Sequence, residues 1–164
     1  MRVNKYEPHI LVLPEDDANR QLARGFLLDP GLLTQKIQVL EEVGGWREVL
    51  NRFNIDHARG MDRFNQRYMI LLIDFDDTPT RLNEAKASIP DHLTERVFVL
   101  GARTDPEALR QAKLGSYETI GLAMAQDCRE DTNTIWDHDL LRHNAGEIER
   151  LREHVRPFLF RAID

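Results

Sequence analysis

Four short, largely apolar runs recur along the chain, and polar or turn residues bound each of them. They cover residues 9–13, 36–40, 69–73 and 96–100. The run at 69–73 is apolar at every position, which is typical of a strand buried on both faces of a sheet. Longer segments with apolar residues at helical spacing separate the runs. This alternation predicts a three-layer α/β fold, with a mainly parallel central sheet of about four or five strands and helices on both faces.

Helix-start signals precede several of the segments between the runs. Asp17 is placed to cap the first helix, and Asp105 followed by Pro106 is a strong start for a later one. The expected helices cover residues 18–28, 46–53, 80–88, 105–114, 117–128 and 147–160. The segments 1–8, 54–67 and 129–144 are expected to form a polar lead-in, a connector and a loop or short helix.

Composition excludes several classes of protein. The 164 residues are expected to form one domain (1–164), with a core from about 9 to 128 and a C-terminal helix at 147–160. No stretch approaches the ~20 apolar residues of a membrane span, so no membrane partner is expected. Cys128 is the single cysteine, which rules out an intramolecular disulfide and suits the reducing cytoplasm. A net charge of −6 argues against nucleic-acid binding through bulk positive charge alone.

Three carboxylates follow the central run closely. Asp74 stands at the carboxyl end of the expected strand, the edge at which open α/β sheets bind their ligands. In extended geometry the side chains of Asp74 and Asp76 point the same way. Clustered carboxylates repel one another unless a cation joins them, and a hard divalent ion such as Mg²⁺ or Mn²⁺ does so best. The sequence therefore predicts a metal site, in which Asp77 is either a further ligand or a turn residue.

A second set of acids follows the first expected strand. The carboxyl ends of parallel strands share one edge of a sheet, so Glu15 lies beside Asp74 if their two strands are neighbours. Glu15 is then expected as a metal ligand, or as a general base whose pKa its acidic neighbours raise. Asp16 and Asp17 either join the site or cap the following helix. Glu118 either extends the cluster or stabilises the first turn of a later helix.

Arginine outnumbers lysine 18 to 4 in this chain, and guanidinium groups suit bidentate phosphate contacts better than ammonium groups do. Arg20, Arg81 and Arg103 lie just past strand ends on the same expected edge. They are therefore candidates for binding a substrate phosphate. For each arginine alone, a surface salt bridge is the simpler explanation.

A glutamate after the first strand and an Asp-x-Asp after a later central strand resemble the Toprim domain. That family occurs in topoisomerases, bacterial primases, old-family nucleases, recombination mediator proteins and ribosomal-RNA maturases. The similarity runs from residue 9 to about residue 124. It implies that Glu15 serves Mg²⁺ coordination or general acid–base chemistry, and that Asp74 and Asp76 hold Mg²⁺.

The chain departs from the Toprim pattern at two positions. The family often has a glycine after its glutamate and an acid four positions on, where this chain has Asp16 and Asn19. A second resemblance uses some of the same residues. Residues 10–21 are similar to the start of response-regulator receiver domains, and residues 97–115 are similar to their later half.

The receiver resemblance implies different roles for the acids. Asp74 would be the phosphoacceptor, and Asp16 or Asp17 would hold Mg²⁺. The chain departs from that family too, because Asp76 is unexpected and no fifth strand ends in a lysine; Lys113 falls inside an expected helix.

Two functions follow from these patterns. If the site is catalytic, Mg²⁺ held by Glu15, Asp74 and Asp76 polarises a phosphodiester and helps to generate hydroxide, as in a metal-dependent nuclease acting on nucleic acid in the cytoplasm. The alternative is a non-enzymatic module, receiver-like or a degenerate Toprim domain, that docks to a protein partner or forms a homo-oligomer. The sequence leaves both open.

Overall fold

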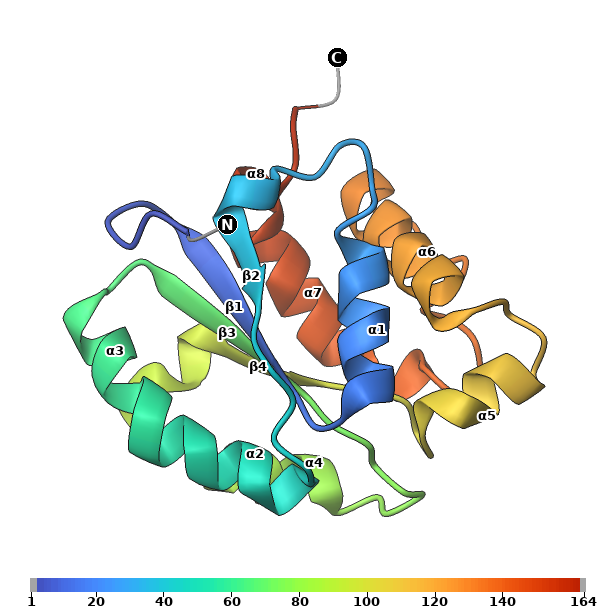
Figure 1. Cartoon of the computed structure of the whole chain (residues 1–164), viewed down its shortest axis with the longest axis horizontal. Helices are drawn as coiled ribbons and strands as arrows, with labels where there is room; N and C mark the ends of the chain where they lie inside the picture. The colour runs from blue at the N-terminus through green and yellow to red at the C-terminus, as the bar shows by residue number, and fades with distance from the viewer. Residues whose placement is uncertain (1–2, 163–164) are drawn as a thin grey trace.

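The computed structural model describes residues 3–162 (Figure 1), so residues 1–2 and 163–164 of the expected domain lie outside it. Four parallel strands form a sheet in the order β2-β1-β3-β4. Helices cover both faces of this sheet. The predicted three-layer α/β fold is therefore confirmed. The strands are β1 (His9–Pro14), β2 (Ile37–Val39), β3 (Arg67–Leu72) and β4 (Val97–Leu100).

The helices connect the strands and then continue beyond β4. Among residues 3–162, none of them is long and apolar enough to cross a membrane. The α-helices are α1 (Asp17–Phe26), α2 (Trp46–Arg52), α3 (Ala58–Arg63), α4 (Arg81–Ala87), α5 (Pro106–Gln111), α6 (Tyr117–Glu130), α7 (Ala145–His154) and α8 (Arg156–Leu159). Shorter elements are the π-helix η2 (Phe53–His57) and the 3₁₀ helices η1 (Thr34–Lys36), η3 (Asp91–Arg96) and η4 (Arg142–Asn144).

The two sides of the sheet pack into two separate apolar cores. Ile10 and Val12 of β1 point into the core under α1, α6 and α7. Leu11, between them in sequence, points into the core under α2, α3 and α4. This alternation follows from the two-residue period of a strand. It explains why the strands are apolar throughout rather than on one face only.

Helices α1 and α6 approach closely because both carry a glycine at their crossing. A Cβ atom on Gly121 would lie 2.0 Å from the carbonyl oxygen of Leu22, and one on Gly25 would lie 2.2 Å from that of Glu118. Any side chain at these positions would force the helices apart. Glu118 therefore contributes its backbone to helix packing.

Two helical segments differ from the prediction. The segment 54–67, expected as a connector, is largely helical, because α2 continues through η2 into α3. Phe53 and Met61 are buried, whereas the residues between them are exposed or half-buried, which hides the helical period. The helix predicted at 147–160, in which Pro157 is expected to distort the last turn, is divided at Val155 into α7 and α8. Proline lacks the N–H group that a continuous helix needs.

Side chains close the free edge of β4. Asn144 accepts a hydrogen bond from the Gly101 N–H (3.2 Å) and donates one to the Gly101 carbonyl oxygen (2.9 Å). The buried carboxylate of Glu147 accepts from the Val99 N–H (3.0 Å) and pairs with Lys86 (2.6 Å). These contacts occupy the edge where a further strand would pair, and the sheet of residues 3–162 has four strands.

The order of the strands reverses between β1 and β3. The chain leaves β1 toward β2 on one side and leaves β3 toward β4 on the other, so the connections diverge above the carboxyl ends of the central pair. In open α/β sheets, such a switch point is where ligands bind. The Glu15 N–H donates to the Leu72 carbonyl oxygen (2.9 Å), which ties the two strand ends together.

Candidate metal centre

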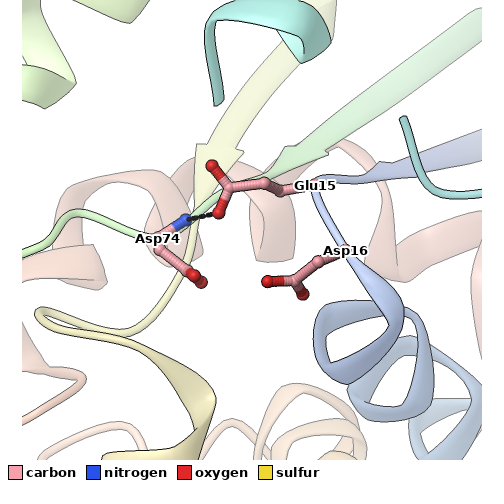
Figure 2. A group of neighbouring side chains, drawn as sticks. All are labelled: Glu15, Asp16 and Asp74. Atoms are coloured by element: carbon pink, nitrogen blue, oxygen red, sulfur yellow. Dashed lines mark hydrogen bonds between the residues drawn. The ribbon is translucent and has the colours of Figure 1, made fainter. Parts of the chain in front are cut away.

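Three carboxylates converge at the switch point between β1 and β3. One oxygen from each of Glu15, Asp16 and Asp74 lies within 4.8 Å of the others. Figure 2 shows Glu15 and Asp16, which follow β1, facing Asp74, which follows β3. The structure therefore brings together the two acids that the parallel-strand argument placed side by side. Asp16, which the sequence left open between cap and ligand, belongs to the same group.

Asp16 also caps α1, because its Oδ1 accepts a hydrogen bond from the Asn19 N–H (2.9 Å). The prediction that Asp17 is the cap is wrong by one residue. Asp17 is the first residue of α1, and its carboxylate pairs with Arg20 (2.7 Å). The cap fixes the direction of the Asp16 side chain, and Figure 2 shows its carboxylate facing Asp74.

A buried amide connects the carboxylates. The Asn19 Nδ2 donates to Asp74 Oδ1 (2.8 Å) and to Asp16 Oδ1 (2.9 Å), and the Asp74 N–H donates to Glu15 Oε2 (3.1 Å). Asn19 has no exposed surface. In the sequence, Asn19 is only a departure from the Toprim pattern. Asn19 stands three residues after the helix cap, a position that faces the cap side chain, and this spacing indicates a contact with Asp16.

Burial changes the acid–base properties of the cluster. Glu15 and Asp74 are only 7% and 8% exposed. Loss of water, reinforced by the neighbouring Asp74 carboxyl, raises the pKa of Glu15 to about 8. Loss of water likewise raises the pKa of Asp74 to about 6, although the hydrogen bond from Asn19 opposes this change. At neutral pH the pair therefore retains a proton, for which a cation would compete.

Asp76 leaves the cluster because the backbone turns after β3. The strand ends at Leu72, and Asp76 has a φ of 46°, in the left-handed region. Its carboxylate pairs with Arg81 (2.6 Å), and Arg81 also donates to the Asp74 carbonyl oxygen (2.9 Å). The prediction that extended geometry aligns Asp74 with Asp76 is wrong. Asp77 also lies in the left-handed region (φ 55°), within this turn.

The remaining candidates lie outside the group of three carboxylates. Glu118 stands in the first turn of α6, as expected for an acid that stabilises a helix start. The three arginines each contact an acid, as the salt-bridge explanation expects. These pairs are Arg20–Asp17 (2.7 Å), Arg81–Asp76 (2.6 Å) and Arg103–Asp77 (3.2 Å).

The donor set suits a hard divalent cation. Carboxylate oxygens are the ligands that Mg²⁺ and Mn²⁺ prefer, and three of them leave room for the waters that Mg²⁺ usually keeps. Comparison of the chain with protein-family models, with curated proteins and with solved structures gave no match. The Toprim and receiver resemblances therefore stay predictions from sequence patterns, and the cluster geometry is the evidence for a cation site.

Proposed function

We propose that this protein binds a divalent cation, Mg²⁺ or Mn²⁺, between the carboxylates of Glu15, Asp16 and Asp74. The observation that carries the proposal is the convergence of three carboxylate oxygens within 4.8 Å. Two of these acids are buried, and desolvated carboxylates repel one another unless a proton or a cation joins them. Their position at the strand-order switch is the one at which α/β proteins bind ligands.

Calorimetric titration with MgCl₂ and MnCl₂ tests this proposal. Asp74→Asn keeps the shape of the side chain but removes a ligand charge, so we expect affinity to fall at least about tenfold. Asp76→Asn is the matched control, because it removes the same charge from a side chain that pairs with Arg81. We expect a clearly smaller loss of affinity, about twofold, because Asp76 acts on Asp74 only through its charge. Equal losses in both variants would contradict a site made by the three converging carboxylates.

One use of such a site is metal-assisted phosphodiester hydrolysis, as expected of a Toprim-like nuclease. The bound cation would supply a Lewis acid for the phosphodiester. Glu15 would either hold the cation with Asp16 and Asp74 or, as a general base beside it, take the proton of the attacking water. Arg20, Arg81 and Arg103 would have to exchange their carboxylate partners for phosphate. Incubation of plasmid DNA and of a single-stranded RNA with the protein and MgCl₂ tests this use, with Asp74→Asn as the inactive control.

The second candidate is a non-enzymatic module that docks to a protein partner or to a second copy of the chain. A specific observation favours it. Arg20, Arg81 and Arg103 each pair with an acid, so these three arginines present little uncompensated positive charge to a phosphate. We favour this use of the cation site over the nuclease.

Sedimentation velocity with and without MgCl₂ separates the two uses. The module predicts a cation-dependent change in self-association, or in binding to a partner, without nucleic-acid cleavage. Cleavage that needs MgCl₂ and is lost in Asp74→Asn would instead establish the nuclease.

A further inference from the structure

We propose that the chain carries a second binding site, for the phosphate group of a small phosphorylated sugar or polyol. The site is a hollow of about 380 Å³ beside α8. The segment after α8 runs beside the loop that leads into β2 (Figure 1), where the Arg161 N–H donates to the Gly31 carbonyl oxygen (2.8 Å). That loop lies at the start of β2, whereas the acid cluster lies at the ends of β1 and β3, so the two sites are far apart. Among residues 3–162, no acid lines it, and four arginines do: Arg129, Arg152, Arg156 and Arg161.

Two of these arginines are neutralised by nearby carboxylates. Arg129 pairs with the buried Asp29 (2.8 Å). Arg152 lies 3.6 Å from a carboxylate oxygen of Asp131, whose side chain is 64% exposed. Arg152 also keeps its Nε buried without a hydrogen-bond partner in the described part of the chain. A buried donor of this kind loses its hydrogen bond to water, and no described group replaces that bond.

The other two arginines keep their positive charge. Within residues 3–162, neither Arg156 nor Arg161 forms a salt bridge with a carboxylate. The Nε and Nη2 of Arg156 donate to the Arg129 carbonyl oxygen (3.2 and 2.9 Å), which fixes the plane of its guanidinium group. A neutral carbonyl holds the group without cancelling its charge. The hollow therefore has a preorganised positive surface in a chain whose net charge is −6.

Helix capping explains part of this arrangement but not all of it. The last carbonyls of α6 accept hydrogen bonds from Arg152 and Arg156, and cations stabilise a helix C-terminus. Arg161 takes no part in that capping. Its side chain makes no hydrogen bond with the residues that the structure describes, yet it lines the same hollow. Phosphate binding gives Arg156 and Arg161, the two arginines that keep their charge, a common role, because guanidinium groups bind phosphate oxygens in pairs.

The neighbouring surface decides the class of ligand. A second hollow, of about 620 Å³, shares Arg152 and Arg156 with the first and is also lined by Trp136. An extended polyanion such as a nucleic acid would have to pass its carboxylates, which repel it. Hydroxyl groups, in contrast, can donate hydrogen bonds to the same carboxylates. A compact phosphate ester with a hydroxylated body therefore fits both hollows. The acids lining the second hollow are Asp131, Asp137, Glu149 and Glu153.

Calorimetric titration with glucose 6-phosphate as the probe tests this inference, in a phosphate-free buffer of low ionic strength. We expect saturable binding to the wild type, and affinity at least about tenfold lower for Arg156→Gln/Arg161→Gln. The matched control is Arg24→Gln/Arg59→Gln, which removes the same charge from two exposed arginines elsewhere and should stay within about twofold. Arg161→Gln alone should still weaken binding about threefold. Because the Arg161 side chain is exposed, this substitution should not disturb the fold.

Four outcomes would overturn the inference. The first is no saturable binding of glucose 6-phosphate up to about 20 mM, well above the ~1 mM expected for a few charge-assisted contacts. The second is an equal loss in the control variant, which would show that only net charge matters. Inorganic phosphate binding as tightly as the ester would remove the role of the acidic hollow. A ten-nucleotide DNA strand binding more tightly than the ester would replace the ligand class by nucleic acid.

Discussion

Replacing Glu15 by glutamine should stabilise the cation-free protein at neutral pH while weakening cation binding. Burial raises the pKa of Glu15 from 4.5 to about 8, so the folded protein binds this proton more tightly than the unfolded chain does. The resulting stability is fully present below pH 4.5 and is lost as the pH rises through about 8. Glutamine resembles the protonated side chain at every pH, so the variant keeps that stability.

The size of the effect follows from the same values. A pH of 7 lies about 2.5 units above the pKa of Glu15 in the unfolded chain, whereas in the folded protein this carboxyl is still mostly protonated. At 1.36 kcal/mol per unit, the variant should therefore gain about 3 kcal/mol in the free energy of unfolding. At pH 5 the expected gain in the free energy of unfolding falls to about 1 kcal/mol. A gain of about 3 kcal/mol in a domain of this size raises the melting temperature by roughly 6 to 12 °C.

Urea unfolding in EDTA at pH 7 and at pH 5 measures this difference. Glu95→Gln is the control, because Glu95 is exposed and its replacement should change the unfolding free energy by less than about 0.5 kcal/mol. Saturating MgCl₂ should reverse the order of stability, since binding at 1,000 times the dissociation constant adds about 4 kcal/mol to the wild type. If Glu15→Gln is no more stable than the wild type at pH 7 in EDTA, the buried carboxylate does not destabilise the fold and the reasoning is refuted.

Three further predictions concern the frame that holds the site. His9 is buried, its Nε2 accepts from Arg67 Nε (3.0 Å), and burial lowers the pKa of its imidazole. Because the folded state resists protonation, the wild type should lose stability relative to His9→Gln as the pH falls below 6.5, and parallel urea-unfolding profiles at pH 7.5 and 5.5 would contradict this. Gly121→Ala should destabilise the fold by about 1–3 kcal/mol in urea, because its Cβ would lie 2.0 Å from the Leu22 carbonyl oxygen, whereas Gly146→Ala, with no atom within 4 Å, should not destabilise it. Asn144→Ala should cost roughly 2–3 kcal/mol and accelerate hydrogen exchange at the Gly101 amide, since both polar backbone groups of Gly101 lose their partner; unchanged exchange would argue against the role of Asn144 at the β4 edge.

The proximity of Glu15 and Asp74 can be predicted from the strand pattern alone. Both residues follow apolar runs, and neighbouring parallel strands end at the same edge, so their proximity needs only the adjacency of β1 and β3. Asp76 lies away from its predicted place because the chain turns through a left-handed backbone at two aspartates, with no glycine to mark the turn. Aspartate tolerates this conformation, so the local sequence does not distinguish a turn from an extended continuation.

Two other features, the buried Asn19 and the helical segment after Phe53, cannot be predicted from the local sequence. Asn19 meets Asp74 across 55 positions of sequence, and nothing near residue 19 specifies a partner at that distance. Between Phe53 and Met61 the helical segment lies on the outside of the molecule, where every position is exposed or half-buried. Its π-helical turn also shifts the phase of the few apolar residues, so the period used to recognise helices is lost.

The most direct test of the cation site is an anomalous difference map from crystals of the protein grown with MnCl₂. The three-carboxylate site predicts one strong peak between Glu15, Asp16 and Asp74, with oxygen distances of about 2.1 Å. The same map from Asp76→Asn crystals should keep this peak. An empty cluster at millimolar Mn²⁺, or a peak that lies instead against Asp76 and Asp77, would contradict the account.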